Sequence, residues 1–176
     1  MKTEQITIRQ ATQSDLPALE WDGEFLHFRR LYDEIFQSMC SGRAVMWVIE
    51  LPGQGIVGQL FVQLSSSRTE LADGHKRAYI YGFRIKPTYR RQGFGSQMMA
   101  VAEEDLRQRN FRWVTLNVAR DNPQARRLYE SLGYRVVASD PGKWSYFDHQ
   151  GNRRNVLEPA WRMEKMIQNE AACVNA

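Results

Sequence analysis

Hydrophobic and polar positions change period along the chain, and these changes predict strands and helices. The nearly continuous apolar run 44–51 predicts a strand covered on both faces, and 56–64 predicts its hairpin partner. An aromatic strand is predicted at 79–85, and Pro87, which has no N–H to give to a ladder, ends it. From 98 to 106, apolar residues recur at helical spacing. A strand, a turn and a helix therefore follow one another in the middle of the chain.

The N-terminal part of the chain predicts one short strand followed by helices. Isoleucines alternate with polar residues at 6–8, which is typical of a strand. The segment 11–17 is expected to turn and start a helix, with Ser14 or Asp15 as its cap. Apolar residues then form one stripe along 20–39, which predicts an amphipathic packing helix.

The C-terminal part of the chain predicts a return to strands. The expected elements are strands at 112–118, 134–138, 143–148 and 156–167 and a helix at 123–132. Asn122 can cap that helix and Pro123 suits its first position. Pro159 introduces a break or an edge into the last strand. The central helix, which begins before 98, lies between the strands at 79–85 and 112–118, and this order predicts a β-α-β unit with parallel strands. The fold class is therefore α/β (α+β).

The length and composition indicate one globular domain, because 176 residues can bury a core but rarely form two domains. We expect 1–176 to be that domain, with 168–176 as a flexible tail. The formal net charge is only +4, and the arginines gather at 84–91, 107–112 and 126–127. An anionic cofactor explains these clusters at least as well as nucleic acid does, and no long Lys/Arg tract is present.

The cysteine count and the apolar runs bear on location and metal binding. Cys40 and Cys173 are the two cysteines, and they offer no C-x-x-C, zinc or disulfide spacing. The N-terminus lacks an apolar signal core, and no apolar run approaches the ~18 residues of a membrane span. We therefore expect a cytoplasmic protein with no metal, no membrane and no nucleic acid among its partners.

The turn before the central helix carries the chemistry that the sequence predicts. Gly93 and Gly95 follow Arg90 and Arg91 and precede the helix. Glycines allow the free N–H groups of a helix start to approach a bulky anion, which favours a diphosphate. A tight connection without a ligand would use glycines in the same way. The nucleotide-binding alternatives are weak, because no Gly-Lys-Ser/Thr occurs and Met98 replaces the third glycine of a dinucleotide motif.

Two motifs resemble the GCN5-related N-acetyltransferase (GNAT) superfamily. The first is Arg90-Arg91-Gln92-Gly93-Phe94-Gly95, which is similar to the family's Q/R-x-x-G-x-G/A signature. The second runs from Asn117 through Asn122 and Tyr129 to Gly133-Tyr134 and is similar to N…N-x-x-A-x-x-x-Y-x-x-x-G-F/Y. The resemblance covers about 4–167 and is strongest in 79–134. It implies a mixed central sheet of six to seven strands flanked by about four helices.

The resemblance also implies which residues hold acetyl-CoA and which assist the reaction. Main-chain groups of Phe83, Arg84 and Ile85 are expected to pair with the pantetheine arm. The pyrophosphate is expected at the loop residues Arg90, Arg91, Gln92, Gly93, Phe94, Gly95 and Ser96. Asn117 and Asn122 match positions near the cofactor. Tyr129 matches both a cofactor contact and the acid that protonates the leaving thiolate, although an aromatic residue packed in the core would show the same spacing.

The sequence departs from the family's pattern at the general base. Ribosomal-protein acetyltransferases of this superfamily often carry a glutamate early in the central strand, where this chain has Tyr79. The base is then expected among Glu20, Asp22, Glu24, Asp73 and His75, or in an ordered water, or is not needed because the amine arrives neutral. Trp21 and His27 are further candidates to meet the acceptor.

Together these features predict an N-acetyltransferase that moves an acetyl group from acetyl-CoA to a primary amine. The amine would belong to a small molecule or a protein and would attack directly in a ternary complex. The alternative is a GNAT-fold module that binds acyl-CoA without turnover, and a nucleotide or nucleic-acid binder is a weaker third. A homodimer through the C-terminal strands is plausible in this superfamily.

Overall fold

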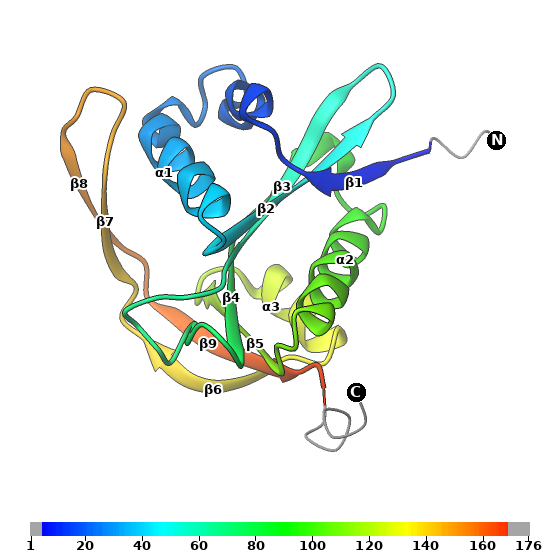
Figure 1. Ribbon diagram of the computed structural model, residues 1–176, viewed down its shortest axis with the longest axis vertical. Coiled ribbons are helices and arrows are strands. Elements are labelled where there is room, and N and C mark those ends of the chain that lie inside the picture. The colour runs from blue at the N-terminus through cyan, green and yellow to red at the C-terminus, as the bar shows by residue number, and fades with distance from the viewer. Residues whose placement is uncertain (1–4, 169–176) are drawn as a thin grey trace.

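A mixed sheet of seven strands organises the molecule, as the computed structural model of residues 5–168 shows (Figure 1). Its strands, in spatial order, are β1 (Thr7–Gln10), β2 (Ala44–Leu51), β3 (Gly55–Gln63), β4 (Arg77–Ile85), β5 (Trp113–Ala119), β9 (Ala160–Met166) and β6 (Arg135–Asp140). β4 and β5 are parallel, whereas the other five neighbouring pairs are antiparallel. The predicted fold class, a mixed α/β sheet, is confirmed.

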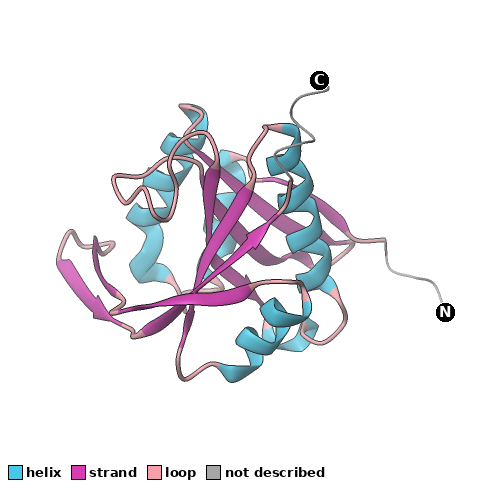
Figure 2. Ribbon diagram, turned by 90° about the horizontal axis from the view of Figure 1, so that it is seen from below, coloured by secondary structure: helices cyan, strands magenta, loops and turns pink. Residues whose placement is uncertain are grey.

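Helices cover both faces of this sheet (Figure 2). The α-helices are α1 (Arg29–Cys40), α2 (Phe94–Gln108) and α3 (Pro123–Ser131), and shorter 3-10 helices occupy Gln13–Glu20, Leu26–Phe28 and Pro87–Tyr89. The predicted start of α3 is confirmed, because Asn122 Oδ1 accepts the Ala125 N–H at 3.1 Å and Pro123 takes the first position.

Two hydrophobic cores lie on opposite faces of the sheet, and β2 belongs to both. Val45, Trp47, Ile49 and Leu51 face the core that α2 and α3 cover. Ala44, Met46 and Val48 face the core formed with α1 and the N-terminal 3-10 helix. Because side chains alternate along a strand, a strand covered on both sides must be apolar throughout, and the prediction made from 44–51 is confirmed.

The strands β4 and β5 diverge halfway along β4. Their parallel pairing runs from Arg77–Trp113 to Ile80–Leu116. β4 stays paired with β3 to its end, although the register shifts between Gln59 and Phe61. Gly82 lies at this bulge with φ +60°, and a Cβ there would come within 2.5 Å of the Phe61 ring. The bulge bends β4 away from β5 and opens the sheet.

The helix predicted at 20–39 begins later than the sequence indicated. Trp21 and Asp22 have φ values of 48° and 56°, and Gly23 follows at 105°. These residues have left-handed backbone conformations, and they interrupt the helical structure between the 3-10 helix that ends at Glu20 and the one that starts at Leu26. The predicted caps Ser14 and Asp15 are also corrected. Thr12 is the N-cap, and its N–H donates to Asp15 Oδ2 at 2.7 Å.

The break or edge expected at Pro159 in the predicted strand 156–167 is confirmed, because two strands in different sheets lie on either side of Pro159. β8 (Arg153–Leu157) pairs with β7 (Lys143–Phe147) in a separate hairpin, and β9 enters the main sheet between β5 and β6. Of the tail predicted at 168–176, the structure describes Gln168 alone. The Gln168 side chain donates to the carbonyls of Arg107 and Phe111, and 169–176, with Cys173, lie outside the described residues.

Candidate active site

A groove of about 610 Å³ opens where β4 diverges from β5, between the end of β4 and the starts of α2 and α3. Eleven of the residues that the sequence proposed for the cofactor line this groove: Phe83, Arg84, Ile85, Arg90, Arg91, Gly93, Phe94, Gly95, Ser96, Asn122 and Tyr129. Gln92 and Asn117 do not. Gln92 is exposed, and its side chain donates to the Thr88 carbonyl at 3.4 Å. The fold thus brings together residues from three elements at one groove.

The start of α2 gives the groove a set of free backbone donors. Gly93 is the N-cap, with φ +80°. The first N–H group that donates within the helix is that of Gln97, to the Gly93 carbonyl. The N–H groups of Phe94, Gly95 and Ser96 come before it and have no acceptor within the helix. A Cβ at Gly95 would lie 3.1 Å from the Phe83 ring and would narrow this end of the groove. The helix dipole favours an anion here.

One of the two arginines of the loop has an unusual backbone conformation. Arg91 has φ +61°, which is uncommon for a residue with a side chain. Arg90 is anchored, because its Nε donates to the Ile85 carbonyl at 2.7 Å. Both side chains therefore stay beside the N-terminus of α2, where their charge adds to that of the helix dipole.

The end of β4 offers a strand edge to a ligand. Within residues 5–168, β4 pairs with β5 only as far as Ile80, so the main chain of Phe83, Arg84 and Ile85 has no strand partner on that side. An extended ligand with amide groups can pair with such an edge as an added strand does. The groove thus has a place for an amide-bearing arm next to a place for a diphosphate.

Tyr129 lines the groove from α3 and stays protonated near neutral pH. Its side chain is 8% exposed and packs on the core beneath α2. Burial raises the pKa of Tyr129 to about 12, and the nearby Tyr79 hydroxyl acts in the same direction. The phenol is therefore a hydrogen-bond donor in the groove at any physiological pH.

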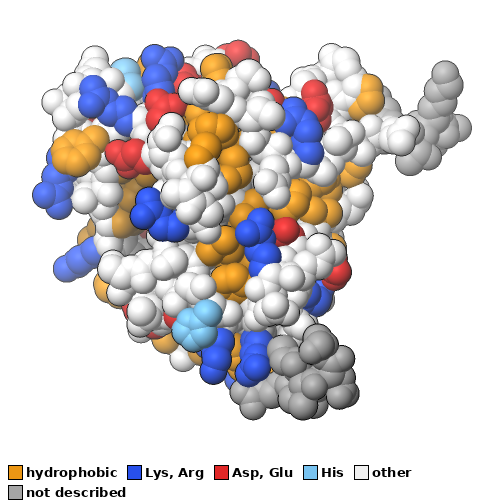
Figure 3. Space-filling view, in the orientation of Figure 1, with side chains coloured by type: hydrophobic (Ala, Val, Ile, Leu, Met, Phe, Trp, Pro, Cys, Tyr) orange, Lys and Arg blue, Asp and Glu red, His pale blue; other side chains and the backbone are white. Residues whose placement is uncertain are grey.

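A second cavity of about 390 Å³ lies on the α1 side of the divergent strands and meets the groove at Arg84. Its walls are mainly aromatic and aliphatic, and they include Phe28, Tyr32, Phe61, Leu71, Tyr79, Tyr81 and Trp144. Figure 3 shows that hydrophobic side chains gather in a band across one face of the molecule, with Lys and Arg beside it. The arrangement of two cavities that share one residue suits a donor and an acceptor that react at their junction.

Asn117 lines the second cavity rather than the groove. Its Oδ1 is buried and has no hydrogen-bond partner among the described residues. Because an unpaired buried oxygen is costly, this atom is a candidate to accept a hydrogen bond from a bound molecule. Its expected contact with the cofactor stays a prediction, and its position favours the acceptor side.

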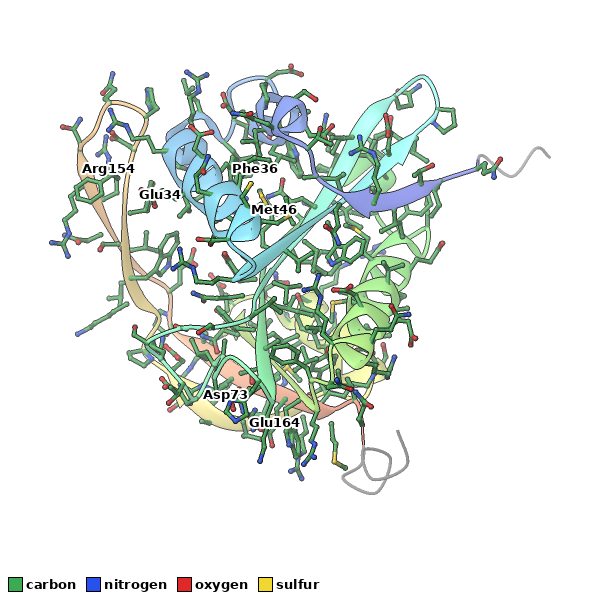
Figure 4. The ribbon with its side chains drawn as sticks, in the orientation of Figure 1. Glu34, Phe36, Met46, Asp73, Arg154 and Glu164 are labelled. Carbon is green, nitrogen blue, oxygen red and sulfur yellow. The ribbon has the colours of Figure 1, made fainter. Side chains whose placement is uncertain are left out.

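The five candidate bases are mostly engaged elsewhere. Glu20 pairs with Arg29 at 2.8 Å. Asp73 accepts N–H groups from three residues of its own loop, and Figure 4 shows it near Glu164, at the end of β4 remote from the groove. His75 is exposed in that loop, and Asp22 is exposed as well. Glu24 is the one of the five that lines the groove.

Some residues that line the cavities were either assigned to another contact by the sequence or not indicated by it. Trp21, which the sequence suggested only as an acceptor contact, lines the groove, and its Nε1–H is buried without a partner in the described part of the chain. Arg68 and Asp140 form an ion pair at 2.9 Å across the second cavity. They are 72 residues apart in the sequence, so no local pattern could have paired them.

Two negative findings complete the description of residues 5–168. No group of three or more His, Cys, Asp or Glu side chains in this range is placed to hold a metal ion. No helix in this range has the length and hydropathy needed to cross a bilayer.

Comparison with known proteins gives related sequences and folds. An uncharacterized N-acetyltransferase, YycN, of Bacillus subtilis is 29% identical over 89 residues, which cover 51% of this chain and 54% of that protein. The mycothiol acetyltransferase of Corynebacterium diphtheriae is 32% identical over 95 residues, which cover 54% of this chain and 30% of that protein. The matches thus span about half, or less, of the curated relatives' length.

Solved structures share the fold at low sequence identity. Ard1 from Thermoplasma volcanium superposes with a TM-score of 0.71 at 20% identity, covering 93% of this chain and 99% of that one. NAA60 of Arabidopsis thaliana, solved with acetyl-CoA, gives 0.70 at 18% identity, with 94% and 100% covered. Spermidine N-acetyltransferase of Vibrio cholerae, solved with CoA and spermine, gives 0.66 at 19% identity, with 92% and 95% covered.

The family assignment rests on the matched part of the chain. The model of the acetyltransferase (GNAT) family matches residues 8–134, which include β4, the groove loop and Tyr129. This is well over half of the sequence. The chain belongs to the acetyltransferase (GNAT) family.

Proposed function

We propose that the protein transfers an acetyl group from acetyl-CoA to a primary amine of a small molecule or a protein. The observation that carries the proposal is the meeting of the groove and the second cavity at Arg84. A donor in the groove and an acceptor in the cavity would be adjacent there. Direct attack in a ternary complex then needs no covalent enzyme intermediate, and we infer a cytoplasmic location for this activity.

Donor binding is assigned to the groove residues. The N–H groups at the start of α2, together with Arg90 and Arg91, would hold the pyrophosphate. The free edge of β4 at Phe83–Ile85 would pair with the pantetheine arm. The donor supplies an activated thioester, and a β4 N–H directed at its carbonyl oxygen would contribute ~3 kcal/mol in the transition state. Acetyl-CoA in a solved structure of this fold supports the choice of donor.

In the transfer, the amine nitrogen bonds to the carbonyl carbon while the bond from that carbon to sulfur breaks. The acetyl amide, CoA thiol and, for an amine that arrives as ammonium, one released proton are the products. Tyr129 is the residue that we assign to the departing sulfur. With a pKa of about 12, its phenol donates a hydrogen bond to the thiolate and stabilises it. Complete transfer of the phenolic proton to a thiolate of pKa ~8.5 would be uphill.

The described part of the chain places no strong base in the cavity for the amine. Asp140 is the buried carboxylate that lines it, and burial by itself would raise its pKa. Hydrogen bonds from Gly142, Arg68 and Arg162 outweigh this effect and hold the pKa of Asp140 well below its usual range. Glu158, the other lining carboxylate, is exposed. We therefore propose that the amine loses its proton to water before the attack.

Two measurements test the proposed function. In the first, acetyl-CoA should raise the melting temperature of the protein, because a ligand that binds only the native state stabilises it by RT ln(1 + [L]/Kd). No shift at millimolar acetyl-CoA would reject the donor. In the second, thiol release is followed against a panel of amines. Stabilisation by acetyl-CoA without thiol release from any amine would instead support the binding module that does not turn over.

A further inference from the structure

The second cavity carries a surplus of positive charge. Its charged lining residues are three cations and two carboxylates: Arg68, Arg84, Lys143, Asp140 and Glu158. Lys143 and Glu158 are exposed and offset each other. Asp140, which is 2% exposed, is already paired with Arg68 at 2.9 Å and with Arg162 at 3.0 Å. Among the described residues, no carboxylate inside the cavity is therefore free for a cationic guest, and the charge of Arg84 is not balanced by a salt bridge.

Arg84 is held in place by aromatic residues rather than by an ion pair. Its Nη1 donates to the Tyr32 hydroxyl at 3.1 Å. Its guanidinium lies 4.2 Å from the ring centre of Phe25 and 5.1 Å from that of Phe28. No carboxylate of residues 5–168 forms a salt bridge with it. Stacking occupies the faces of a guanidinium and leaves in-plane N–H groups for a planar anion, which can bind through two hydrogen bonds.

The position of Arg84 limits where such an anion can sit. Arg84 lines both the groove and the cavity, and its main chain belongs to the free β4 edge at which the thioester is placed. An anion bound by its side chain would be close to the reacting carbonyl. The amine that attacks this carbonyl must then be only a few bonds from the anion. The aromatic wall, which includes Tyr32, Phe61 and Trp144, would receive the rest of the molecule.

We propose that the acceptor is an amine with an adjacent carboxylate on an apolar or aromatic body, as in a large apolar α-amino acid, and that Arg84 binds the carboxylate. This inference rests on the proposed function and names its substrate class. The chemistry follows the step given above: the amine nitrogen gains the acetyl group, CoA leaves as the thiol, and the carboxylate is unchanged. A polyamine such as spermidine would meet the surplus positive charge and is excluded as the preferred substrate.

The test compares molecules that differ only in the carboxylate. Phenylalanine and 2-phenylethylamine form one pair, leucine and 3-methylbutylamine a second, and spermidine is the polycationic comparison. For the wild-type protein, kcat/KM should favour the amino acid in each pair by about tenfold or more, as expected for a charge-assisted bidentate contact. Equal values within each pair, or a higher value for spermidine, would overturn the proposal.

Variants then locate the contact. Arg84→Met keeps an unbranched apolar side chain against Phe25 and Phe28 but removes the charge, and it should bring the ratio within each pair close to one. The ratio is taken within one protein, so changes in donor binding cancel. Lys143→Met removes an equal charge from the exposed part of the cavity and should leave the ratio near its wild-type value. A preference that survives in Arg84→Met, or disappears equally in Lys143→Met, contradicts the role of Arg84.

A binding measurement separates this inference from failure of the enzyme function. N-acetylphenylalanine retains the carboxylate and N-acetyl-2-phenylethylamine lacks it, and neither needs turnover. Isothermal titration in the presence of CoA should show tighter binding of the first by about tenfold in the wild type, with the difference lost in Arg84→Met. Equal affinities would reject carboxylate recognition even in an active enzyme. A clear preference without thiol release would support the recognition and reject the transfer reaction.

Discussion

Tyr129 is buried and also lines the groove, and its environment decides which chemistry it can perform. The ring packs in the core, with the Tyr134 ring centre 6.1 Å away, while the residue also lines the groove. Burial raises its pKa to about 12, so the phenol remains neutral throughout the range in which amines lose their protons. We infer that Tyr129 does not limit the pH range of the reaction.

The substitution Tyr129→Phe tests this role. It keeps the ring and its packing but removes the donor, so we expect kcat to fall by roughly a hundredfold while KM for acetyl-CoA changes by less than about twofold. In the wild type, the rate should rise with pH as the amine deprotonates and should not decline below pH ~10. Steady-state kinetics from pH 6 to 10 measure both effects. An unchanged kcat would remove Tyr129 from the mechanism.

Asp140 connects several segments that form the wall of the second cavity. Its carboxylate accepts the Gly142 N–H at 2.8 Å and pairs with Arg68 and Arg162. These contacts connect the end of β6, the loop before β4 and β9. Because the folded-state pKa of Asp140 is lowered, the contribution of Asp140 is present above its unfolded pKa of ~3.9 and is lost as the pH falls below that value.

We expect Asp140→Asn to lower the free energy of unfolding by about 3 kcal/mol at pH 7, since it leaves two arginines without their buried partner. The difference from the wild type should shrink between pH 4 and pH 2, where the wild type loses the same interaction. Urea denaturation at several pH values measures this. Asp105→Asn, which breaks an exposed pair with Arg109, is the control and should cost less than about 0.5 kcal/mol. Equal losses would contradict the assignment.

At the scale of elements, the bulge in β4 shapes the groove that we propose as the donor site. Gly82 has φ +60°, and its backbone carbonyl accepts a hydrogen bond from Gln59 at 3.3 Å. Beyond this point the β4 edge is free on the β5 side. A regular strand would stay paired to its end and would leave no edge for a ligand. The bulge therefore leaves the end of β4 free to pair with the proposed ligand.

Gly82→Ala is expected to destabilise the protein strongly, because the added Cβ would meet Phe61 at 2.5 Å in a left-handed conformation. We expect a loss of about 3 kcal/mol, from backbone strain and overpacking together. Gly53→Ala is a matched control, since Gly53 has φ +75° but nothing within 4 Å of its Cβ position. It should lose only about 1 kcal/mol. Urea denaturation of both variants measures the difference, and similar losses would contradict the packing argument.

The β7–β8 hairpin is an element whose place relative to the main sheet the sequence did not indicate. It lies outside the main sheet (Figure 1), and it exposes Trp144, Phe147 and Leu157 by 41%, 53% and 63%. Trp144 also lines the second cavity. The hairpin thus contributes to the proposed acceptor site, and the homodimer expected through the C-terminal strands stays a prediction.

At the scale of the whole molecule, the two cores share one sheet, and we expect that they cannot unfold independently. The residues of β2 alternate between them, as Trp47 and Val48 show. Melting of either core would remove one face of β2 and expose its apolar side chains to water. We therefore propose that the described part of the chain is one cooperative unit, in agreement with the expectation of a single domain.

Calorimetry should accordingly show one transition, in which the van't Hoff and calorimetric enthalpies agree within about 10%. Acetyl-CoA should move this whole transition to higher temperature rather than split it, because its groove is built from β4, α2 and α3 together. Two separate transitions, or an enthalpy ratio far from one, would contradict a single unit.

Much of the donor site could be predicted because its determinants are local. Gly93 and Gly95 follow a strand and open a helix, and Asn122-Pro123 starts the next one. Backbone conformation and capping act over a few residues, so the sequence reveals them directly. The acceptor side could not be predicted in this way. Arg84 and Tyr32 are 52 residues apart and meet only because the sheet places β4 against α1.

The sequence by itself determined the order of the strands and helices in 44–138, the family and the glycine loop. Periodicity, turn residues and short motifs depend on neighbours along the chain, and these are fixed before folding. Only the tertiary structure decided that the strands on either side of Pro159 join different sheets, that Asn117 lines the second cavity and that Arg84 forms no salt bridge within residues 5–168. These features depend on contacts between residues that are distant in the sequence, and the packing of the complete sheet and its helices determines those contacts.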